Sequence, residues 1–275
     1  MEDNIIEVLK NSYCIDVESV EKSEESTDGN VYIVTEANSG TRYALKVYVE
    51  LQQADTMAEL HTYLNGIKLE APRVIKGKDK NVISHFCNSN NEKRYVICYS
   101  FADGEKLGNL ELTNEKIIAI SKYLRRLHSI TQNELGLKSV PFEIESNRQS
   151  VLHFDITKHN IFFDDEKICF IDFDDAKFGP SVCDIAIALT NLFISKSSGV
   201  DIEGMKLFID SYYGDDDKTK QEELTLVKRA ALCWLKSIIN NPNFDTSTRS
   251  GLENKIEKWG RTHFLEFTFA TFYAI

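Results

Sequence analysis

The stretch HFDITKHNIFFDDEKICFIDFDD, residues 153–175, places seven acidic residues and two histidines around two short apolar runs. The runs NIFF and ICFI have the length and composition of short strands, and the polar DDE between them is typical of a turn. A β-hairpin with polar turns would explain the pattern. Carboxylates at the ends of apolar strands are also what a magnesium-dependent phosphoryl-transfer site requires. The remaining sequence favours the second interpretation.

The bulk properties of the chain are those of a globular protein with one large domain or two lobes. It has 275 residues, of which 42% are hydrophobic, so it can bury a sizeable core. Its net charge of −11 argues against a function in which the protein binds nucleic acid or anionic membranes through phosphate contacts. The same charge fits a cationic partner, although solubility alone also explains it. We therefore expect neither a nucleic-acid nor a membrane partner, and the oligomeric state stays open.

Cysteine usage and the absence of targeting signals indicate a soluble, cytoplasmic protein. The six cysteines are scattered and form no CxxC pair, so we expect reduced thiols, neither a disulfide framework nor a zinc site. The opening MEDNIIEVLK lacks the basic and then apolar order of a signal peptide. Since no apolar run approaches about 18 residues, we expect no transmembrane span.

The first part of the chain, residues 1–100, is expected to form a β-rich lobe with one helix. A helix is predicted from Gln52 to about Asn65, where Gly66 follows as a stop. The turn sequences ANSG and CNSNNE separate β-rich runs into hairpins. The strands are predicted at 31–36, 41–49, 81–86 and 93–101.

The second part, residues 101–275, is expected to form a mostly helical lobe. Apolar residues recur at helical spacing between Asn114 and His128, and Thr113 is a suitable N-cap. After the two short strands of the opening stretch, further helices are predicted at 183–195, 201–213, 219–240 and 249–272. The fold class is therefore α+β, with a β-rich N-terminal lobe and a mostly helical C-terminal lobe.

The opening stretch supplies the groups that phosphoryl transfer needs. Such a site must orient a hydroxyl group, clamp phosphates and neutralise their charge. Asp155 is suited to accept the hydroxyl proton, and five residues later Asn160 offers an amide oxygen to Mg²⁺. Asp172, at the end of an apolar strand, offers a second hard oxygen ligand.

The N-terminal lobe supplies groups suited to bind a nucleotide. Lys46 lies within the strand YALKVY, and Glu59 lies on the following helix, where it could pair with this lysine. Lys46 would then contact the nucleotide phosphates. The polar turn SEESTDGNVY stands where a phosphate-covering loop would lie, although Gly29 is its only glycine.

The order YALK, AEL, YSFADG, LRRLH, HFDITKHN and FIDFDDA resembles that of the aminoglycoside phosphotransferase and choline kinase-like family over residues 25–195. The resemblance implies a two-lobed, protein-kinase-like fold and the use of ATP, or of GTP, with Mg²⁺. It implies the following roles: Asp155 as catalytic base, Asn160 and Asp172 as magnesium ligands, Lys46 and Glu59 as an ion pair, the backbones of Ser100 and Ala102 as adenine contacts, and Asp184 as a brace of the catalytic loop.

The sequence also departs from the family pattern in three places. Phe154 stands where the family usually has glycine, ITKH stands where LHPG is common, and the insert at residues 129–152 is short. None of these changes removes a catalytic group. His153 is interpreted as a structural histidine that hydrogen-bonds within the loop.

The expected function is that of an ATP- and magnesium-dependent phosphotransferase that acts on a small-molecule hydroxyl group. The acidic composition favours a cationic amino-alcohol or an aminoglycoside as acceptor. The alternatives are a kinase of protein Ser/Thr, a kinase of a neutral metabolite such as homoserine, and a nucleotide-binding scaffold without catalysis. The retention of base, amide and metal carboxylate together speaks against the scaffold.

Overall fold

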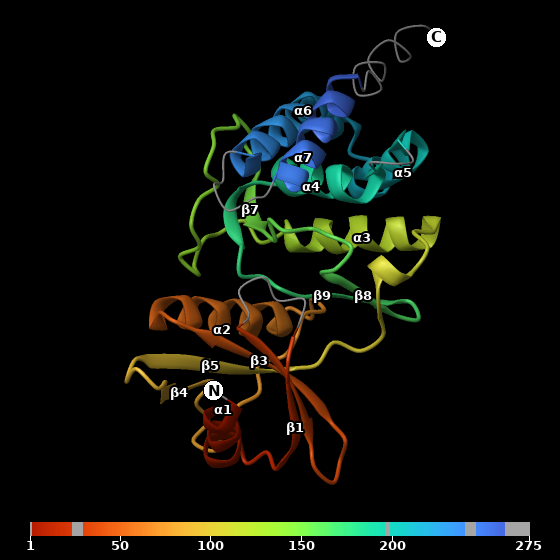
Figure 1. The fold of residues 1–275 in the computed structure, drawn as a ribbon. Helices are drawn as coiled ribbons and strands as arrows, with labels where there is room; N and C mark the ends of the chain where they lie inside the picture. Colours follow the sequence, from red (N-terminus) through yellow and green to blue (C-terminus); the bar gives the residue numbers. More distant parts are fainter. Residues whose placement is uncertain (1, 24–29, 196–198, 240–245, 262–275) are drawn as a thin grey trace, which may run out of the picture. The chain divides into compact units, whose positions relative to one another are not determined.

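The computed structural model describes residues 2–23, 30–195, 199–239 and 246–261, which form two compact units (Figure 1). The first unit comprises Met1–Asp103 together with Cys169–Ile171. The second comprises Gly104–Ile168 and Asp172–Ile275. The mixed α+β fold class expected from the sequence is confirmed, and each unit is described by itself below.

The first unit is built on a five-stranded antiparallel sheet with the strand order β1-β2-β3-β5-β4. Four strands lie where the β-rich runs predict them, whereas β1 was not predicted. Its sequence VESVEK is short and charged and gives little β signal. The strands are β1 (Val17–Lys22), β2 (Val31–Glu36), β3 (Arg42–Tyr48), β4 (Ile83–Cys87) and β5 (Lys93–Ser100).

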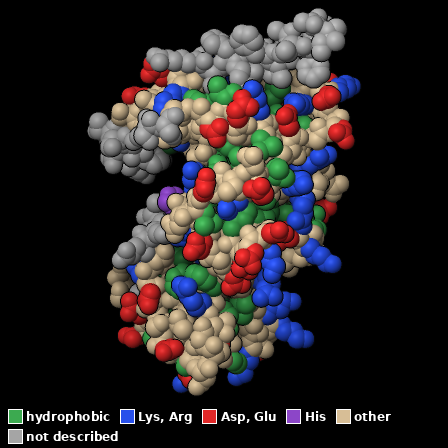
Figure 2. All heavy atoms as spheres, turned by 90° about the vertical axis from the view of Figure 1, so that its right-hand side faces the viewer, with side chains coloured by type: hydrophobic (Ala, Val, Ile, Leu, Met, Phe, Trp, Pro, Cys, Tyr) green, Lys and Arg blue, Asp and Glu red, His purple; other side chains and the backbone are tan. Residues whose placement is uncertain are grey.

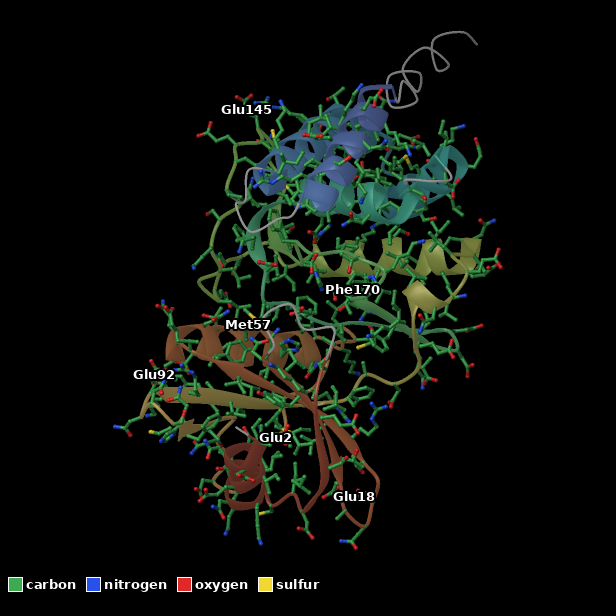
Figure 3. The ribbon with its side chains drawn as sticks, in the orientation of Figure 1. Glu2, Glu18, Met57, Glu92, Glu145 and Phe170 are labelled. Atoms are coloured by element: carbon green, nitrogen blue, oxygen red, sulfur yellow. The ribbon has the colours of Figure 1, made fainter. Side chains whose placement is uncertain are left out.

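Helices cover both faces of this sheet (Figure 1). Alternation along the strands directs one set of apolar side chains, among them Leu45 and Val47, toward the core formed with α1 (Glu2–Val8) and the π-helical segment Leu9–Tyr13. On the other face lies α2 (Leu51–Gly66), which packs on β3 and β5. Met57, labelled in Figure 3, is one of the buried side chains of α2.

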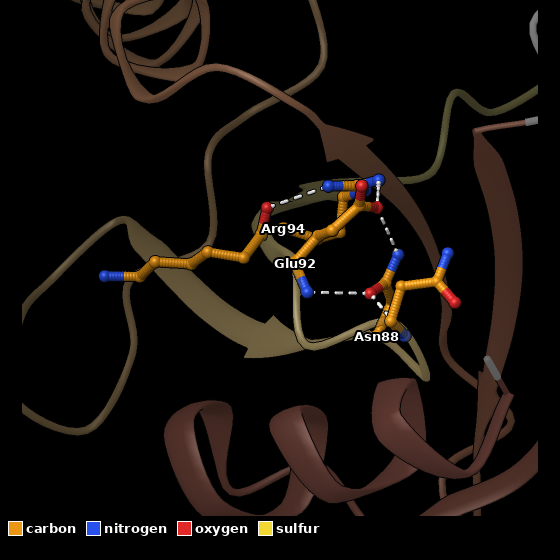
Figure 4. Close-up of polar contacts among 5 residues, drawn as sticks. Asn88, Glu92 and Arg94 are labelled. Atoms are coloured by element: carbon orange, nitrogen blue, oxygen red, sulfur yellow. Dashed lines mark hydrogen bonds and ion pairs between the residues drawn. The ribbon is translucent and has the colours of Figure 1, made fainter.

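The turn between β4 and β5 is fixed by the polar residues that predicted it (Figure 4). The Asn88 carboxamide oxygen accepts hydrogen bonds from the backbone N–H groups of Asn90 (3.0 Å) and Glu92 (2.9 Å). The Asn88 side-chain nitrogen donates to the Glu92 carboxylate at 2.8 Å, which also pairs with Arg94 at 2.5 Å. Such Asx interactions replace the backbone bonds that a turn lacks.

The second unit combines short strand pairs with a bundle of helices. The opening stretch forms β8 and β9 as predicted, joined with β6 in a three-stranded sheet, whereas β7 pairs with β10. The predicted last helix is present as α7, and its expected continuation to residue 272 lies outside the described residues.

The strands of this part of the chain are β6 (Glu105–Lys106), β7 (Gln149–Leu152), β8 (Ile161–Asp164), β9 (Lys167–Phe170), β10 (Lys177–Pro180), β11 (Ile194–Ser195) and β12 (Gly199–Val200). The helices are α3 (Asn114–Leu127), α4 (Val182–Phe193), α5 (Ile202–Tyr213), α6 (Asp217–Ile239) and α7 (Thr246–Arg261), with a 3₁₀ turn at Leu107–Asn109.

Helix α4 is the central helix of the second unit. Its sequence VCDIAIALTNLF is apolar around nearly the whole circumference, and every residue except Asn191 is buried. A helix of this kind must be covered on all sides, and α4 packs against both α5 and α6. Because Asp184 lies in its first turn, a carboxylate is carried into the core of the unit.

The thiols and the surface charge of the described residues were also compared with the sequence patterns. In the part of the chain that the structure describes, no helix is both long and apolar enough to cross a membrane. All six cysteines are free thiols, and Cys98 and Cys183 are buried. On the face drawn in Figure 2, acidic side chains are scattered and many basic ones gather toward the right-hand edge, so the acidic charge does not form a single patch there.

Gly104 is held at a backbone position that no other residue fits. Its φ is +86°, and a Cβ added there would lie 2.0 Å from the carbonyl oxygen of Phe163 on β8. Gly136 also has a positive φ, +62°, but its added Cβ would meet nothing within 4 Å. Both glycines have a positive φ, but only Gly104 lies too close to a neighbouring backbone for a side chain. Comparing them therefore separates the effect of the close contact from that of the backbone conformation.

We expect Gly104→Ala to destabilise the protein more than Gly136→Ala. Both substitutions carry the left-handed penalty of about 1–2 kcal/mol, and Gly104→Ala adds an overlap worth about 1–3 kcal/mol. Urea unfolding of the two variants measures the difference. Equal losses would show that the contact between Gly104 and β8 does not constrain the fold.

Candidate active site

The predicted base and the predicted amide ligand contact each other on the loop between β7 and β8. The Asn160 side-chain nitrogen donates to the Asp155 carboxylate oxygen Oδ2 at 2.7 Å and to the Asp155 backbone carbonyl at 3.0 Å. Asn160 is only 8% exposed, so this geometry is enclosed. Because both contacts use the amide nitrogen, the Asn160 oxygen is turned away from Asp155 and is left to accept another ligand.

The Asp155 carboxyl lies among other carboxylates that make its ionisation less favourable. Burial is the main cause that raises the pKa of Asp155, and the negative charges of Asp175 and Asp172 raise it further. The neighbouring His153 and the hydrogen bond from Asn160 act in the opposite direction but do not reverse the shift. Asp155 is thus a stronger proton acceptor than an ordinary aspartate, and the site has an excess of negative charge that a cation would relieve.

Two residues of the site adopt left-handed backbone conformations that side chains disfavour. Phe154, next to Asp155, has a φ of +65°, and Asp172 has a φ of +61°. Such positions cost on the order of 1–2 kcal/mol each in residues other than glycine. Strain of this kind persists only where the surroundings enforce it, and it concentrates at functional sites.

The surroundings of Phe154 explain why a large residue is accepted at this position. Its ring lies 6.2 Å from that of Phe142, in the segment before β7, and the Lys177 ammonium lies 6.0 Å from its centre. These contacts join the short insert and β10 to the loop. The departure from the glycine of the family pattern is therefore compensated by aromatic and cation–π packing.

Helix α4 holds the loop at two points, one on each side of Asp155. The buried Asp184 carboxylate accepts the backbone N–H groups of His153 (2.8 Å) and Phe154 (2.9 Å). Two turns later, the Asn191 side-chain nitrogen donates to the carbonyl of Ile156 at 2.9 Å. Asp184 thus braces the loop, and Asn191 adds a second anchor that the sequence analysis did not identify.

His153 is a structural residue of the loop, as its interpretation in the sequence indicated. It is fully buried, its ring packs on Phe173 with 4.4 Å between ring centres, and its Nδ1 accepts the Asp155 backbone N–H at 3.3 Å. His128, at the end of α3, was missed. Its Nε2 contacts Asp184 Oδ2 at 3.1 Å, a partner 56 residues away that no local pattern links to it.

Asn160 on this loop and Asp172 after β9 carry donors with the chemistry of a magnesium site. An amide oxygen and a carboxylate are hard ligands, which Mg²⁺ prefers. Among the described residues, no group of three or more His, Cys, Asp or Glu side chains is arranged to hold a metal ion by itself. Asn160 and Asp172 therefore fit a metal ion whose other ligands are phosphate and water oxygens.

In the first unit, Lys46 and Glu59 occupy different environments. Lys46 is half-buried in the middle of β3, paired with Val31 on one side and Ile97 on the other. Glu59 is exposed on α2. The ion pair between Lys46 and Glu59 that the resemblance implied stays a prediction. Gly29 lies outside the described residues.

The connector after β5 limits which of its backbone groups are available to a nucleotide base. The Ser100 N–H donates to the Arg73 carbonyl at 2.8 Å, and the Ser100 hydroxyl accepts the Arg73 N–H at 2.9 Å. Any contact of the Ser100 backbone with adenine must therefore be made by its carbonyl oxygen. Ala102 follows Phe101, whose ring centre lies 3.9 Å from the Arg42 guanidinium carbon.

Replacing Asp155 by Asn is expected to stabilise the protein at neutral pH when no nucleotide or metal is present. Since the folded-state pKa of Asp155 is raised, its ionised form costs free energy in the native state. This cost exists at neutral pH and disappears as the pH falls toward about 3.9, the ordinary aspartate value. The amide oxygen introduced by the substitution can still accept the bond from Asn160.

Urea unfolding of Asp155→Asn across this pH range measures the effect. The exposed Asp164 in β8 supplies the matched control, Asp164→Asn, which should change the free energy of unfolding little at any pH. An Asp155→Asn variant that is less stable than the parent at neutral pH would contradict the proposed crowding of carboxylates.

Comparisons with known proteins bear on the fold and on the segment that carries the candidate site. Residues 137–206 match the model of the phosphotransferase enzyme family. No curated protein sequence is similar enough to count as a match. The family match includes the loop with Asp155 and Asn160, the Asp172 strand end and the helix α4 that braces them.

Solved structures share the fold at low sequence identity. An amicoumacin kinase in complex with AMP-PNP, Ca²⁺ and Ami has a TM-score of 0.73 at 13% identity, over 95% of this chain and 94% of its own. A microcompartment-associated aminopropanol kinase has a TM-score of 0.69 at 14% identity, over 94% of this chain and 95% of its own. A choline kinase from Streptococcus pneumoniae has a TM-score of 0.58 at 13% identity, over 94% of this chain and 99% of its own.

These findings confirm the resemblance that the motifs indicated. The family match covers the segment with the candidate catalytic residues, and the fold likeness extends over nearly the whole chain. Residues 137–206 are similar to the phosphotransferase enzyme family, and the chain shares the fold of an amicoumacin kinase, an aminopropanol kinase and a choline kinase.

Proposed function

We propose that this protein is a nucleotide- and magnesium-dependent phosphotransferase that acts on a hydroxyl group of a small molecule. The observation that carries the proposal is the pairing of Asp155 with Asn160, with the charges of Asp172 and Asp175 within electrostatic range. A proton acceptor beside an amide and carboxylate pair suited to Mg²⁺ is the arrangement that phosphoryl transfer needs.

Asp155 is proposed to orient the acceptor hydroxyl and to take its proton. The hydroxyl oxygen attacks the γ-phosphorus, the bond from that phosphorus to the β–γ bridging oxygen breaks, and the nucleoside diphosphate leaves. The proton passes to the Asp155 carboxylate, whose raised pKa suits it to this role. The bond from Asn160 fixes the carboxylate for the transfer.

Asn160 and Asp172 would hold the metal ion, which when bound supplies positive charge that neutralises the phosphates. Asn160 is held before any ligand binds by its bonds to Asp155, and Asp172 has a left-handed backbone conformation. Preorganisation of this kind lowers the cost of assembling the site.

Lys46, the Ser100 carbonyl and the Ala102 N–H are proposed to contact the nucleotide. A half-buried ammonium in the middle of a sheet is held in one place and can contact phosphates without moving far. The Ser100 carbonyl oxygen would accept from the base amino group, and the Ala102 N–H would donate to a ring nitrogen. The base can be adenine or guanine, and ATP is the first nucleotide to test.

A cationic amino-alcohol or an aminoglycoside is the proposed acceptor class. The net charge of −11 and the carboxylates around Asp155 favour a cation near the site. Two proteins of the same fold are named for amino-alcohol substrates, an aminopropanol and choline. Peptides and neutral hydroxyl compounds such as homoserine are the competing acceptors.

The role of Asp155 is tested by ADP release measured over a panel of aminoglycosides, choline, ethanolamine, homoserine and Ser/Thr peptides. We expect at least one cationic acceptor to stimulate release, and Asp155→Asn to lower kcat by about 10²–10⁴-fold because general-base catalysis is lost. Asp164→Asn, the exposed carboxylate of β8, should keep full activity. An Asp155→Asn variant with the turnover of the parent would exclude the proposed base.

The role of Lys46 is tested by nucleotide binding. Lys46→Met should weaken ATP binding about tenfold, which corresponds to about 1.4 kcal/mol, because a charged contact to the phosphates is lost. Lys22→Met, an exposed lysine on β1 of the same unit, is the matched control and should bind ATP normally. Isothermal titration calorimetry gives both affinities, and equal affinities would remove Lys46 from the site.

A further inference from the structure

A chain of buried polar contacts leads from α5 to the loop that carries Asp155. The Tyr212 hydroxyl lies 2.7 Å from His128 Nδ1, and His128 Nε2 lies 3.1 Å from Asp184 Oδ2. The same carboxylate accepts the backbone N–H groups of the residues just before Asp155, His153 and Phe154. Tyr212, His128 and Asp184 are almost completely buried, at 1%, 4% and 0% exposure.

One partner of His128 places a proton on Nε2. An ionised carboxylate only accepts hydrogen bonds, so the 3.1 Å contact with Asp184 requires a proton on His128 Nε2. On a neutral ring Nδ1 has a lone pair, and the Tyr212 hydroxyl 2.7 Å away is then the donor, whereas on a doubly protonated ring Nδ1 would donate to Tyr212. Tyr212 thus satisfies the one ring nitrogen that Asp184 does not reach.

We propose that Tyr212 is a positioning residue, whose hydroxyl holds neutral His128 so that His128 and Asp184 keep the Asp155 loop in its reactive geometry. This inference rests on the proposed function of Asp155. Without the hydroxyl, His128 Nδ1 would be a buried acceptor that has lost its donor. The ring must then turn or take up a second proton, and either change alters the contact with Asp184.

The neighbouring tyrosine offers a matched control. Tyr213 follows Tyr212 on α5, is equally buried at 2% exposure, and packs its ring against that of Tyr212 at 4.9 Å between centres. Its hydroxyl donates instead to the Glu223 carboxylate at 2.8 Å, which also accepts from Arg148 at 3.1 Å. Loss of the Tyr213 hydroxyl therefore removes a buried hydrogen bond of α5 without touching His128.

The test compares Tyr212→Phe with Tyr213→Phe in the full-length protein by three measurements. Spectra of ¹⁵N-labelled histidine report the protonation of His128, assigned by means of His128→Gln. Amide hydrogen exchange reports the protection of the His153 and Phe154 N–H groups. ADP release with the stimulating acceptor gives kcat and KM.

In the unsubstituted protein we expect neutral His128 with its proton on Nε2 and a hydrogen-bonded Nδ1. Tyr212→Phe should change the His128 spectrum, lower the protection of both loop amides about tenfold and lower kcat about tenfold with KM for ATP unchanged, as expected for a lost buried hydrogen bond. Tyr213→Phe should lose stability but keep all three properties. A doubly protonated His128 in the unsubstituted protein would overturn the proposal. Equal effects of the two variants on the loop amides would also overturn it.

The spectra and the exchange rates need no turnover, so they decide the role of Tyr212 even if no acceptor is phosphorylated. Absence of turnover in the unsubstituted protein would count against the proposed function alone. The unsubstituted spectrum also needs no variant to fold, so the predicted protonation of His128 can be refuted directly.

Discussion

The geometry of the candidate site depends on one buried carboxylate, that of Asp184. A charge that is removed from water must be compensated by hydrogen bonds, and Asp184 obtains them from the loop N–H groups of His153 and Phe154 and from His128. Because the carboxylate lies on α4 and its donors lie on the loop and at the end of α3, it draws these three parts of the chain together. The apolar surface of α4 supplies the burial that makes each of these bonds strong.

Several features of the candidate site lower the stability of the folded protein. Asp155 is partly buried and feels the charges of Asp172 and Asp175, and the backbones of Phe154 and Asp172 are held in left-handed conformations. A sequence optimised for stability alone would remove these features. Their presence together on one loop and one strand end agrees with the roles that we propose for Asp155 as base and Asp172 as metal ligand. The rigid bracing from α4 is what keeps this unfavourable arrangement in place.

Sequence patterns predicted the elements and residues that local chemistry determines. The strands β2 to β5 of the first sheet, the helix at α2 and the hairpin of β8 and β9 follow from apolar periodicity and turn residues. Asp155 and Asn160 are five residues apart, so a single loop brings them together.

Other features could not be predicted because they depend on contacts distant in the sequence. Strand β1 was not predicted because its charged sequence forms a strand only through pairing with β2. The contact of His128 with Tyr212 joins residues 84 apart, and packing of α3 on α5 alone creates it. The pairing of Lys46 with Glu59 stays a prediction, because helical spacing alone does not fix which side chains of α2 meet β3.

The central claim is that a phosphoryl group passes from a nucleotide to a hydroxyl group held at Asp155. The most direct measurement is ³¹P nuclear magnetic resonance of the protein with ATP, Mg²⁺ and a pool of cationic amino-alcohols and aminoglycosides. Our account predicts that the γ-phosphate signal falls while a new phosphomonoester signal rises in equal amount, and that neither change occurs with Asp155→Asn. Conversion of ATP to ADP with inorganic phosphate as the only new product, or an equal ester signal from the variant, would contradict it.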